Sequence, residues 1–253
     1  IEYRQRVKKG DPLPSFSDEV RLNKFISNAG ICSRREADVL IAAGVVMINN
    51  KVITELGYKV KPNDEVKYDG ETIKSFNKRY VLLNKPKGFY STLGESKGRK
   101  TALSLVQKAC RELLFPVDKL DKDATGLLLF TNDTDLSKKL NHPRFQSKKL
   151  YHVESNKPLT KSHLKQMIEG LDLEDGKTKV LNATHVQDGT SREVGIEISS
   201  GKKQVIYRMF EAMGLAVVKL DRVRFSGLTK KDLPRGMFRH LSENEISFLK
   251  MTK

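Results

Sequence analysis

Cysteine is scarce in this sequence, and the few cysteines form no recognisable pattern. The 253 residues include only Cys32 and Cys110. A disulfide scaffold or a four-ligand zinc site is therefore not supported, and a reducing cytoplasm fits this composition best. The histidines lack the spacing of metal ligands on a helix; they are His142, His152, His163, His185 and His240. We expect no metal and no other cofactor.

Long apolar segments are also lacking. No run of about 18 apolar residues occurs. Residues 1–10 carry four basic side chains without the apolar segment of a signal peptide. We predict a cytoplasmic protein with no membrane partner.

Positive charge is what the sequence has in excess. The formal net charge is +16, which attracts polyanions, with nucleic acid as the first candidate and an anionic membrane surface as the second. Apolar residues make up 38% of the chain and recur along its whole length, which is enough for a folded core. The length suits one medium domain and one small domain, without internal repeats.

Hydrophobic periodicity divides the chain into two folded regions. The boundaries we expect are a flexible basic arm over 1–17, a first domain over 18–74, a linker over 75–78 and a second domain over 79–253. In the first domain, helical spacing begins near Val20. The sequence Ser33-Arg-Arg-Glu36 is typical of a capping box that begins a second helix, and short strands follow.

Strands and helices mix in the second region without regular alternation. The sequence predicts a helix over 102–114, a strand over 126–130 buried on both faces, and a last helix that Ser242 caps. The predicted fold class is α+β, with a small αL-type domain followed by a domain whose mixed, largely antiparallel sheet is flanked by helices.

Basic side chains gather on the two helices of the first domain. An ordinary solvated helix face is the alternative interpretation. The stretches Arg21-Leu-Asn-Lys-Phe-Ile26, Ala29-Gly-Ile-Cys-Ser-Arg-Arg-Glu-Ala37 and Ala43-Gly-Val-Val-Met-Ile-Asn-Asn-Lys-Val52 resemble the S4-like RNA-binding domain of a small-subunit ribosomal protein, tyrosyl-tRNA synthetases and many rRNA-modifying enzymes. The RNA contacts that this resemblance implies are Arg21, Lys24, Arg34, Arg35 and Lys51.

Four stretches of the second domain resemble the RsuA/RluB-type family of ribosomal RNA pseudouridine synthases. They are Leu83-Asn-Lys-Pro-Lys-Gly88, Pro116-Val-Asp-Lys-Leu-Asp-Lys-Asp-Ala-Thr-Gly-Leu-Leu-Leu-Phe-Thr-Asn-Asp133, Lys148-Lys-Leu-Tyr-His-Val153, and Arg208-Met-Phe-Glu-Ala-Met-Gly214 with Arg222-Val-Arg-Phe225. The resemblance implies an enzyme that lifts a uridine out of RNA, breaks its glycosidic bond, rotates the base and joins carbon to carbon. The first stretch adds Lys85 and Lys87 to the implied RNA contacts.

The family's catalytic carboxylate matches Asp121, and its base-stacking tyrosine matches Tyr151. Without the flanking match, Asp121 belongs to a solvated acidic turn and Tyr151 is a half-buried strand aromatic. Lys119 and Arg208 are the basic side chains that the match offers as partners for the carboxylate.

Three positions depart from the family pattern. Asp118 replaces a glycine, and Lys119 replaces an arginine whose planar fork a lysine cannot reproduce. We expect the carboxylate of Asp118 to raise the pKa of its neighbour Asp121 and to repel phosphate. Tyr207 takes the place of the arginine that pairs with the catalytic Asp, and Arg208 is rotated from it by about 100° on a helix.

These observations leave two hypotheses for function. The first is an rRNA pseudouridine synthase, and the second is a catalytically inactive paralogue that binds rRNA in ribosome assembly or on the ribosome. Both predict a monomer when free that binds ribosomal RNA, in a ribosomal subunit or its precursor.

Overall fold

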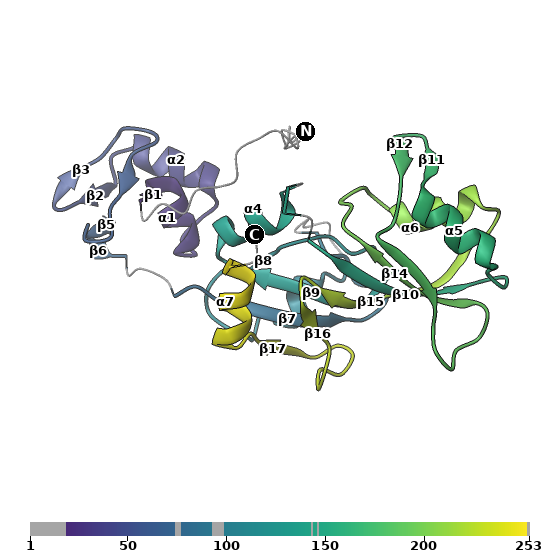
Figure 1. The fold of residues 1–253 in the computed structure, drawn as a ribbon. Helices are drawn as coiled ribbons and strands as arrows, with labels where there is room; N and C mark the ends of the chain where they lie inside the picture. The colour runs from purple at the N-terminus through teal and green to yellow at the C-terminus, as the bar shows by residue number, and fades with distance from the viewer. Residues whose placement is uncertain (1–18, 74–76, 93–98, 143, 146, 252–253) are drawn as a thin grey trace. The chain divides into compact units, whose positions relative to one another are not determined.

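The chain divides into two units in the computed structural model, which describes residues 19–73, 77–92, 99–142, 144–145 and 147–251 (Figure 1). The smaller unit spans 14–79 and includes 110–114, and the larger unit includes 80–109 and 115–253. The expected arm over 1–17 and part of the expected linker lie outside the described residues, so those boundaries stay predictions. No helix in the described ranges is long and apolar enough to cross a membrane.

Two helices pack beside short strands in the smaller unit. Its elements are β1 (Val20–Arg21), α1 (Leu22–Asn28), α2 (Arg34–Ala42), β2 (Val46–Ile48), β3 (Lys51–Val52), β4 (Lys59–Val60), β5 (Val66–Tyr68) and β6 (Glu71–Thr72). The capping box is confirmed: the Ser33 hydroxyl accepts from the Glu36 amide, and the Glu36 carboxylate accepts from the Ser33 amide at 2.7 Å. Leu22 and Ile26 of α1 meet Ile41 of α2 in a fully buried core.

A nine-stranded sheet forms the larger unit. Its path is β13-β14-β10-β15-β9-β7-β17, with β16 paired to β15 and β8 paired to β9. The strands are β7 (Tyr80–Lys85), β8 (Phe115–Pro116), β9 (Thr125–Thr131), β10 (Lys149–Ser155), β13 (Asn182–His185), β14 (Glu193–Ile198), β15 (Val217–Phe225), β16 (Leu228–Thr229) and β17 (Phe238–His240). Among the described pairs only β9 and β15 run parallel, which confirms the α+β class and the largely antiparallel sheet.

Two apolar clusters support the two halves of this sheet. The helices of the unit are α3 (Ala102–Val106), α4 (Thr134–Asn141), α5 (Lys161–Glu169), α6 (Val205–Ala212) and α7 (Glu243–Met251). Residues of α5 and α6 pack with β10, β13 and β14, while residues of α4 and α7 pack with β7 and β9 (Figure 1). The central strand β9 is buried from Gly126 onward, as its unbroken apolar run predicted.

The helix predicted over 102–114 is wrong in length, because α3 ends at Val106. The chain must become extended before Phe115–Pro116, which pair with the far end of β9 as β8. Glu112, inside the predicted helix, instead accepts a hydrogen bond from Arg79 at 2.9 Å.

Candidate active site

The two halves of the sheet meet where β9 and β15 pair in parallel. Gly126 lies opposite Arg222 with a φ of +108°, and a Cβ at Gly126 would lie 2.3 Å from the Arg222 carbonyl oxygen. Only glycine permits this approach. This pairing brings the acidic loop before β9, residues 117–124, close to side chains of β15, β10 and α6.

Asp118 of this loop joins two buried cations. Arg222, fully buried, donates through Nη1 to Asp118 Oδ2 at 2.6 Å and through Nε to the Leu127 carbonyl at 2.7 Å. Lys149 Nζ lies 3.0 Å from the same Asp118 oxygen. Burial alone would raise the pKa of Asp118, but Lys149 and Arg222 lower it to about 2. The Asp118 carboxylate is therefore neutralised by two cations.

Asp121 is half-buried and has different neighbours. Burial raises the pKa of Asp121 and Asp123 adds to the rise, while Lys203 and Lys85 oppose it. The pKa of Asp121 is raised, as expected, but by burial and Asp123 and not by Asp118, whose carboxylate pairs with Arg222 and Lys149. Lys203, just before α6, carries a cation near Asp121 that the family motifs did not identify.

The two basic partners expected for Asp121 have different surroundings. Lys119 is exposed. Arg208 pairs with both carboxylate oxygens of Asp175, from Nη1 to Oδ1 at 3.0 Å and from Nη2 to Oδ2 at 3.2 Å. Asp175 lies in the hairpin of β11 (Leu171–Leu173) and β12 (Gly176–Thr178). Arg208 is therefore paired with another carboxylate, the cations that act on Asp121 are Lys203 and Lys85, and the role of Lys119 stays a prediction.

Lys85 is an interior cation. Its side chain is fully buried, and its ammonium donates to the carbonyls of Pro86, Phe89 and Lys122 at 2.9 to 3.1 Å. Burial lowers the pKa of Lys85 to about 8, and Asp123 and Asp121 oppose this shift. The implied RNA contact of Lys85 is therefore corrected: Lys85 lies beneath the loop, whereas Lys87 is exposed.

Tyr207 lies near Asp121, and Tyr151 lies near Tyr207. Tyr207 projects from α6, and burial together with Asp121 and Asp123 raises its pKa to about 12. The phenol is therefore protonated at neutral pH, at the position where the family resemblance places an arginine. Tyr151 of β10 is only 8% exposed, in the apolar cluster against which Tyr207 packs. Its stacking role stays a prediction.

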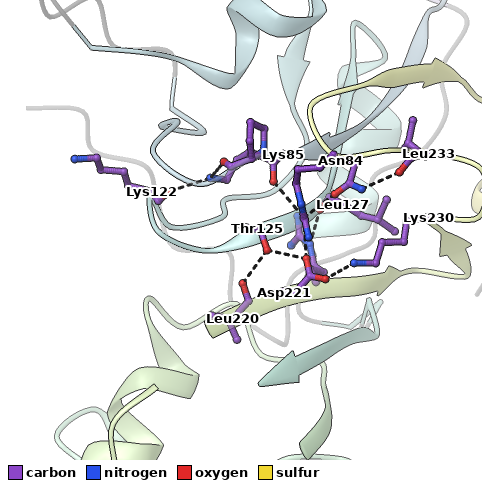
Figure 2. Close-up of polar contacts among 12 residues, drawn as sticks. Asn84, Lys85, Lys122, Thr125, Leu127, Leu220, Asp221, Lys230 and Leu233 are labelled. Atoms are coloured by element: carbon purple, nitrogen blue, oxygen red, sulfur yellow. Dashed lines mark hydrogen bonds and ion pairs between the residues drawn. The ribbon is translucent and has the colours of Figure 1, made fainter. Parts of the chain in front are cut away.

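A polar cluster at Asp221 joins the loop before β17 to the sheet. Figure 2 shows Asp221 between Thr125 and Lys230; the Thr125 hydroxyl donates to Oδ1 at 2.8 Å, and Lys230 pairs with Oδ2. Arg235 donates to Asp221 at 3.0 Å and to the Asn84 side chain at 2.8 Å. These contacts join β7, β9 and β15 through side chains, at the end of β9 that follows the acidic loop.

The smaller unit carries the basic side chains predicted for RNA. Arg21, Arg34, Arg35 and Lys51 are exposed, and Lys24 is half-buried. Four of the five come from α1, α2 and the residue preceding α1. No group of three potential metal-ligating side chains occurs within the described ranges.

Two family models match this chain. The model described as RNA pseudouridylate synthase matches residues 79–212, and the model described as S4 domain matches residues 20–66. A solved structure described as a pseudouridylate synthase is 27% identical, covers 91% of this chain and 99% of its own, and superposes with a TM-score of 0.63.

Several whole-length relatives are similar to this chain. An "Uncharacterized RNA pseudouridine synthase" of Aquifex aeolicus is 38% identical over 91% of this chain and 94% of the relative. The "Ribosomal large subunit pseudouridine synthase B" of Bacillus subtilis is 36% identical over 91% and 95%. The "Dual-specificity RNA pseudouridine synthase RluF" of Escherichia coli is 36% identical over 92% and 79%.

Proposed function

Because the chain belongs to the RNA pseudouridine synthase family, in the RsuA/RluB branch with an S4 domain, we propose that it isomerises a uridine in large-subunit ribosomal RNA. The observation that carries the proposal is the setting of Asp121, half-buried beside Lys203, Lys85 and Tyr207 at the crossing of the two sheet halves. The name of the Bacillus subtilis relative supports the choice of RNA.

The reaction requires few groups from the protein. A uridine flipped out of the RNA presents its glycosidic bond to Asp121, the bond from C1′ to N1 breaks, and a bond from C1′ to C5 forms after the base rotates. The proton lost from C5 is balanced by the one gained at N1, so no oxidant or reductant is needed. Lys203 and Lys85 favour the charged form of Asp121 against the desolvation that substrate binding increases.

The structure distinguishes the three carboxylates of the loop. Asp118 is held by Arg222 and Lys149, and Asp123 is exposed. Asp121 alone of the three is half-buried without an ion pair at hydrogen-bonding distance in the described part of the chain. We therefore assign the reaction to Asp121.

The test uses Asp121→Asn and Asp123→Asn as a matched pair. Pseudouridine is mapped on ribosomal RNA from cells that carry the native gene, no gene, or either variant. We expect one uridine to lose its modification without the gene and with Asp121→Asn, while Asp123→Asn retains it. RNA affinity should survive in both variants, because size is kept. Native cells without any pseudouridine that depends on this gene would contradict the proposal.

A binding role without catalysis is the second candidate. Tyr207 favours it, because a protonated phenol beside Asp121 supplies no positive charge. We test it by placing Lys119→Arg and Tyr207→Arg together in the native chain. One well-placed charge in a preorganised site is worth about 3–4 kcal/mol. If the native chain is a synthase weakened at these two positions, the double change should raise its turnover by orders of magnitude. A chain without activity before and after the double change would instead support the binding role.

A further inference from the structure

We propose that Tyr90, with Arg99 and Lys122, forms an RNA subsite beside Asp121 that stacks a base and holds the phosphate of a nucleotide flanking the target uridine. This inference rests on the proposed function for the identity of the RNA. Tyr90 and Arg99 lie outside the four stretches that resemble the family.

The backbone around Tyr90 is joined to the loop of Asp121 on both sides. The Gly88 amide donates to the Lys122 carbonyl at 2.9 Å. The Ser91 hydroxyl donates to the Leu120 carbonyl at 2.8 Å and accepts from the Leu120 amide at 3.0 Å. Leu120 and Lys122 flank Asp121, while Gly88 and Ser91 flank the segment of Tyr90. These hydrogen bonds therefore hold the two segments side by side.

The other edge of Tyr90 is fixed as well. Its amide donates to the Lys100 carbonyl at 2.9 Å, and its own carbonyl accepts from the Ala102 amide at 2.7 Å. The ring is half-buried. A partly exposed aromatic ring on a fixed backbone loses little conformational entropy when a base stacks on it.

Two cations lie over this ring. The Arg99 guanidinium carbon is 5.1 Å from the ring centroid, and Lys122 Nζ is 5.5 Å from it. Both side chains are exposed, and neither forms an ion pair with a carboxylate within the described ranges. Two cations near one ring form a local positive charge that attracts an anion. A nucleotide supplies a partner for each: its base stacks on the ring, and its phosphate pairs with the two cations.

The test measures binding of an oligouridylate of about 12 nucleotides, a length within the range that single-strand sites cover. Every variant is the full chain with Arg34→Ala and Arg35→Ala, so that the smaller unit does not mask the effect. Tyr90→Ala should weaken binding about tenfold, which is the lower part of the range for one stacked base. Tyr90→Phe keeps the ring face and should bind as before.

The cations are tested through salt dependence. Arg99→Gln with Lys122→Gln should reduce the log–log salt slope by about 1.4, since a single-strand phosphate contact contributes about 0.7. Lys138→Gln with Lys161→Gln, on α4 and α5, serves as the matched control for charge and should leave the slope nearly unchanged. Equal affinity of Tyr90→Ala and Tyr90→Phe would overturn the stacking contact, and equal slopes for the two charge pairs would overturn the phosphate contact. Both assays measure binding and not turnover. A chain that forms no pseudouridine but binds as expected would contradict the proposed function and still support this RNA subsite.

Discussion

Asp118 is the residue whose expected role changes most once its neighbours in the structure are known. In the sequence it adds a negative charge close to Asp121, the carboxylate to which we assign the reaction. In the structure its oxygen lies 2.6 Å from Arg222 Nη1 and 3.0 Å from Lys149 Nζ. An isolated guanidinium in a dry interior is strongly unfavourable, so the carboxylate makes burial of Arg222 possible. The carboxylate of Asp118 therefore balances the positive charges of Arg222 and Lys149.

Removing that charge should destabilise the larger unit. In Asp118→Asn, Arg222 stays fully buried without its carboxylate, and breaking one side of a buried pair costs about 3–5 kcal/mol. Urea unfolding monitored by circular dichroism measures the change in the free energy of unfolding. Asp172→Asn, at an exposed position of β11, is the control for loss of one carboxylate. Equal stability of the two variants would show that the pair contributes nothing.

The same ion pair predicts an acid dependence. The pKa of Asp118 is about 2 in the folded chain, below the ordinary 3.8. The folded state therefore binds this proton less readily than the unfolded chain does. The stability from Asp118 is fully present above pH 3.8 and is lost as the pH falls through about 2. Native chain should lose on the order of 2 kcal/mol more than Asp118→Asn across this window, measured by urea unfolding at each pH.

At the scale of elements, the crossing of β9 and β15 determines where the site lies. We expect Gly126→Ala to prevent native packing of the larger unit, because the added Cβ lies 2.3 Å from one backbone oxygen of Arg222 and 2.5 Å from its nitrogen. Gly176→Ala is the matched control, since Gly176 has a similar φ of +96° but open space around the added Cβ. It should cost only about 1–2 kcal/mol of backbone strain. Thermal unfolding and the yield of soluble protein are measured for both variants. Equal unfolding temperatures and yields would mean that β15 moves aside easily for the added Cβ of Gly126→Ala.

Elements with strong local signals were predictable from the sequence, and contacts between distant strands were not. The capping boxes at Ser33 and Ser242 depend on residues three apart, and both form. The apolar run of β9 also has a local signature. By contrast, α3 ends early because β8 must reach β9, and that requirement comes from tertiary pairing. The parallel pairing at Gly126 joins positions 96 residues apart, Gly126 with Arg222, and no local pattern can encode that separation.

For the molecule as a whole, the order of the motifs was enough to identify the family and the acidic loop. It was not enough to predict which basic side chain lies beside which carboxylate. Lys203 lies near Asp121 because α6 packs on the sheet, and Arg208 turns toward Asp175 because it is one position further along that helix. The sequence alone suggests that Lys85 is a basic surface residue, but every residue of its strand β7 is buried. Which cation faces which carboxylate depends on packing, and packing is settled only in three dimensions.

Both units expose basic side chains, and each should contribute its own share of RNA affinity. Arg34 and Arg35 are exposed in the first turn of α2. With a structured rRNA fragment, Arg34→Ala with Arg35→Ala should weaken binding and reduce the log–log salt slope by about one unit for each phosphate that the variant no longer binds. Arg34→Lys with Arg35→Lys retains both charges and should keep most of the slope, even if affinity falls with the loss of the guanidinium geometry. Filter binding from low to moderate salt gives both quantities. An unchanged slope in the alanine pair would mean that this helix faces protein or solvent, and the RNA would then be bound by the larger unit, where Tyr90 and its two cations lie.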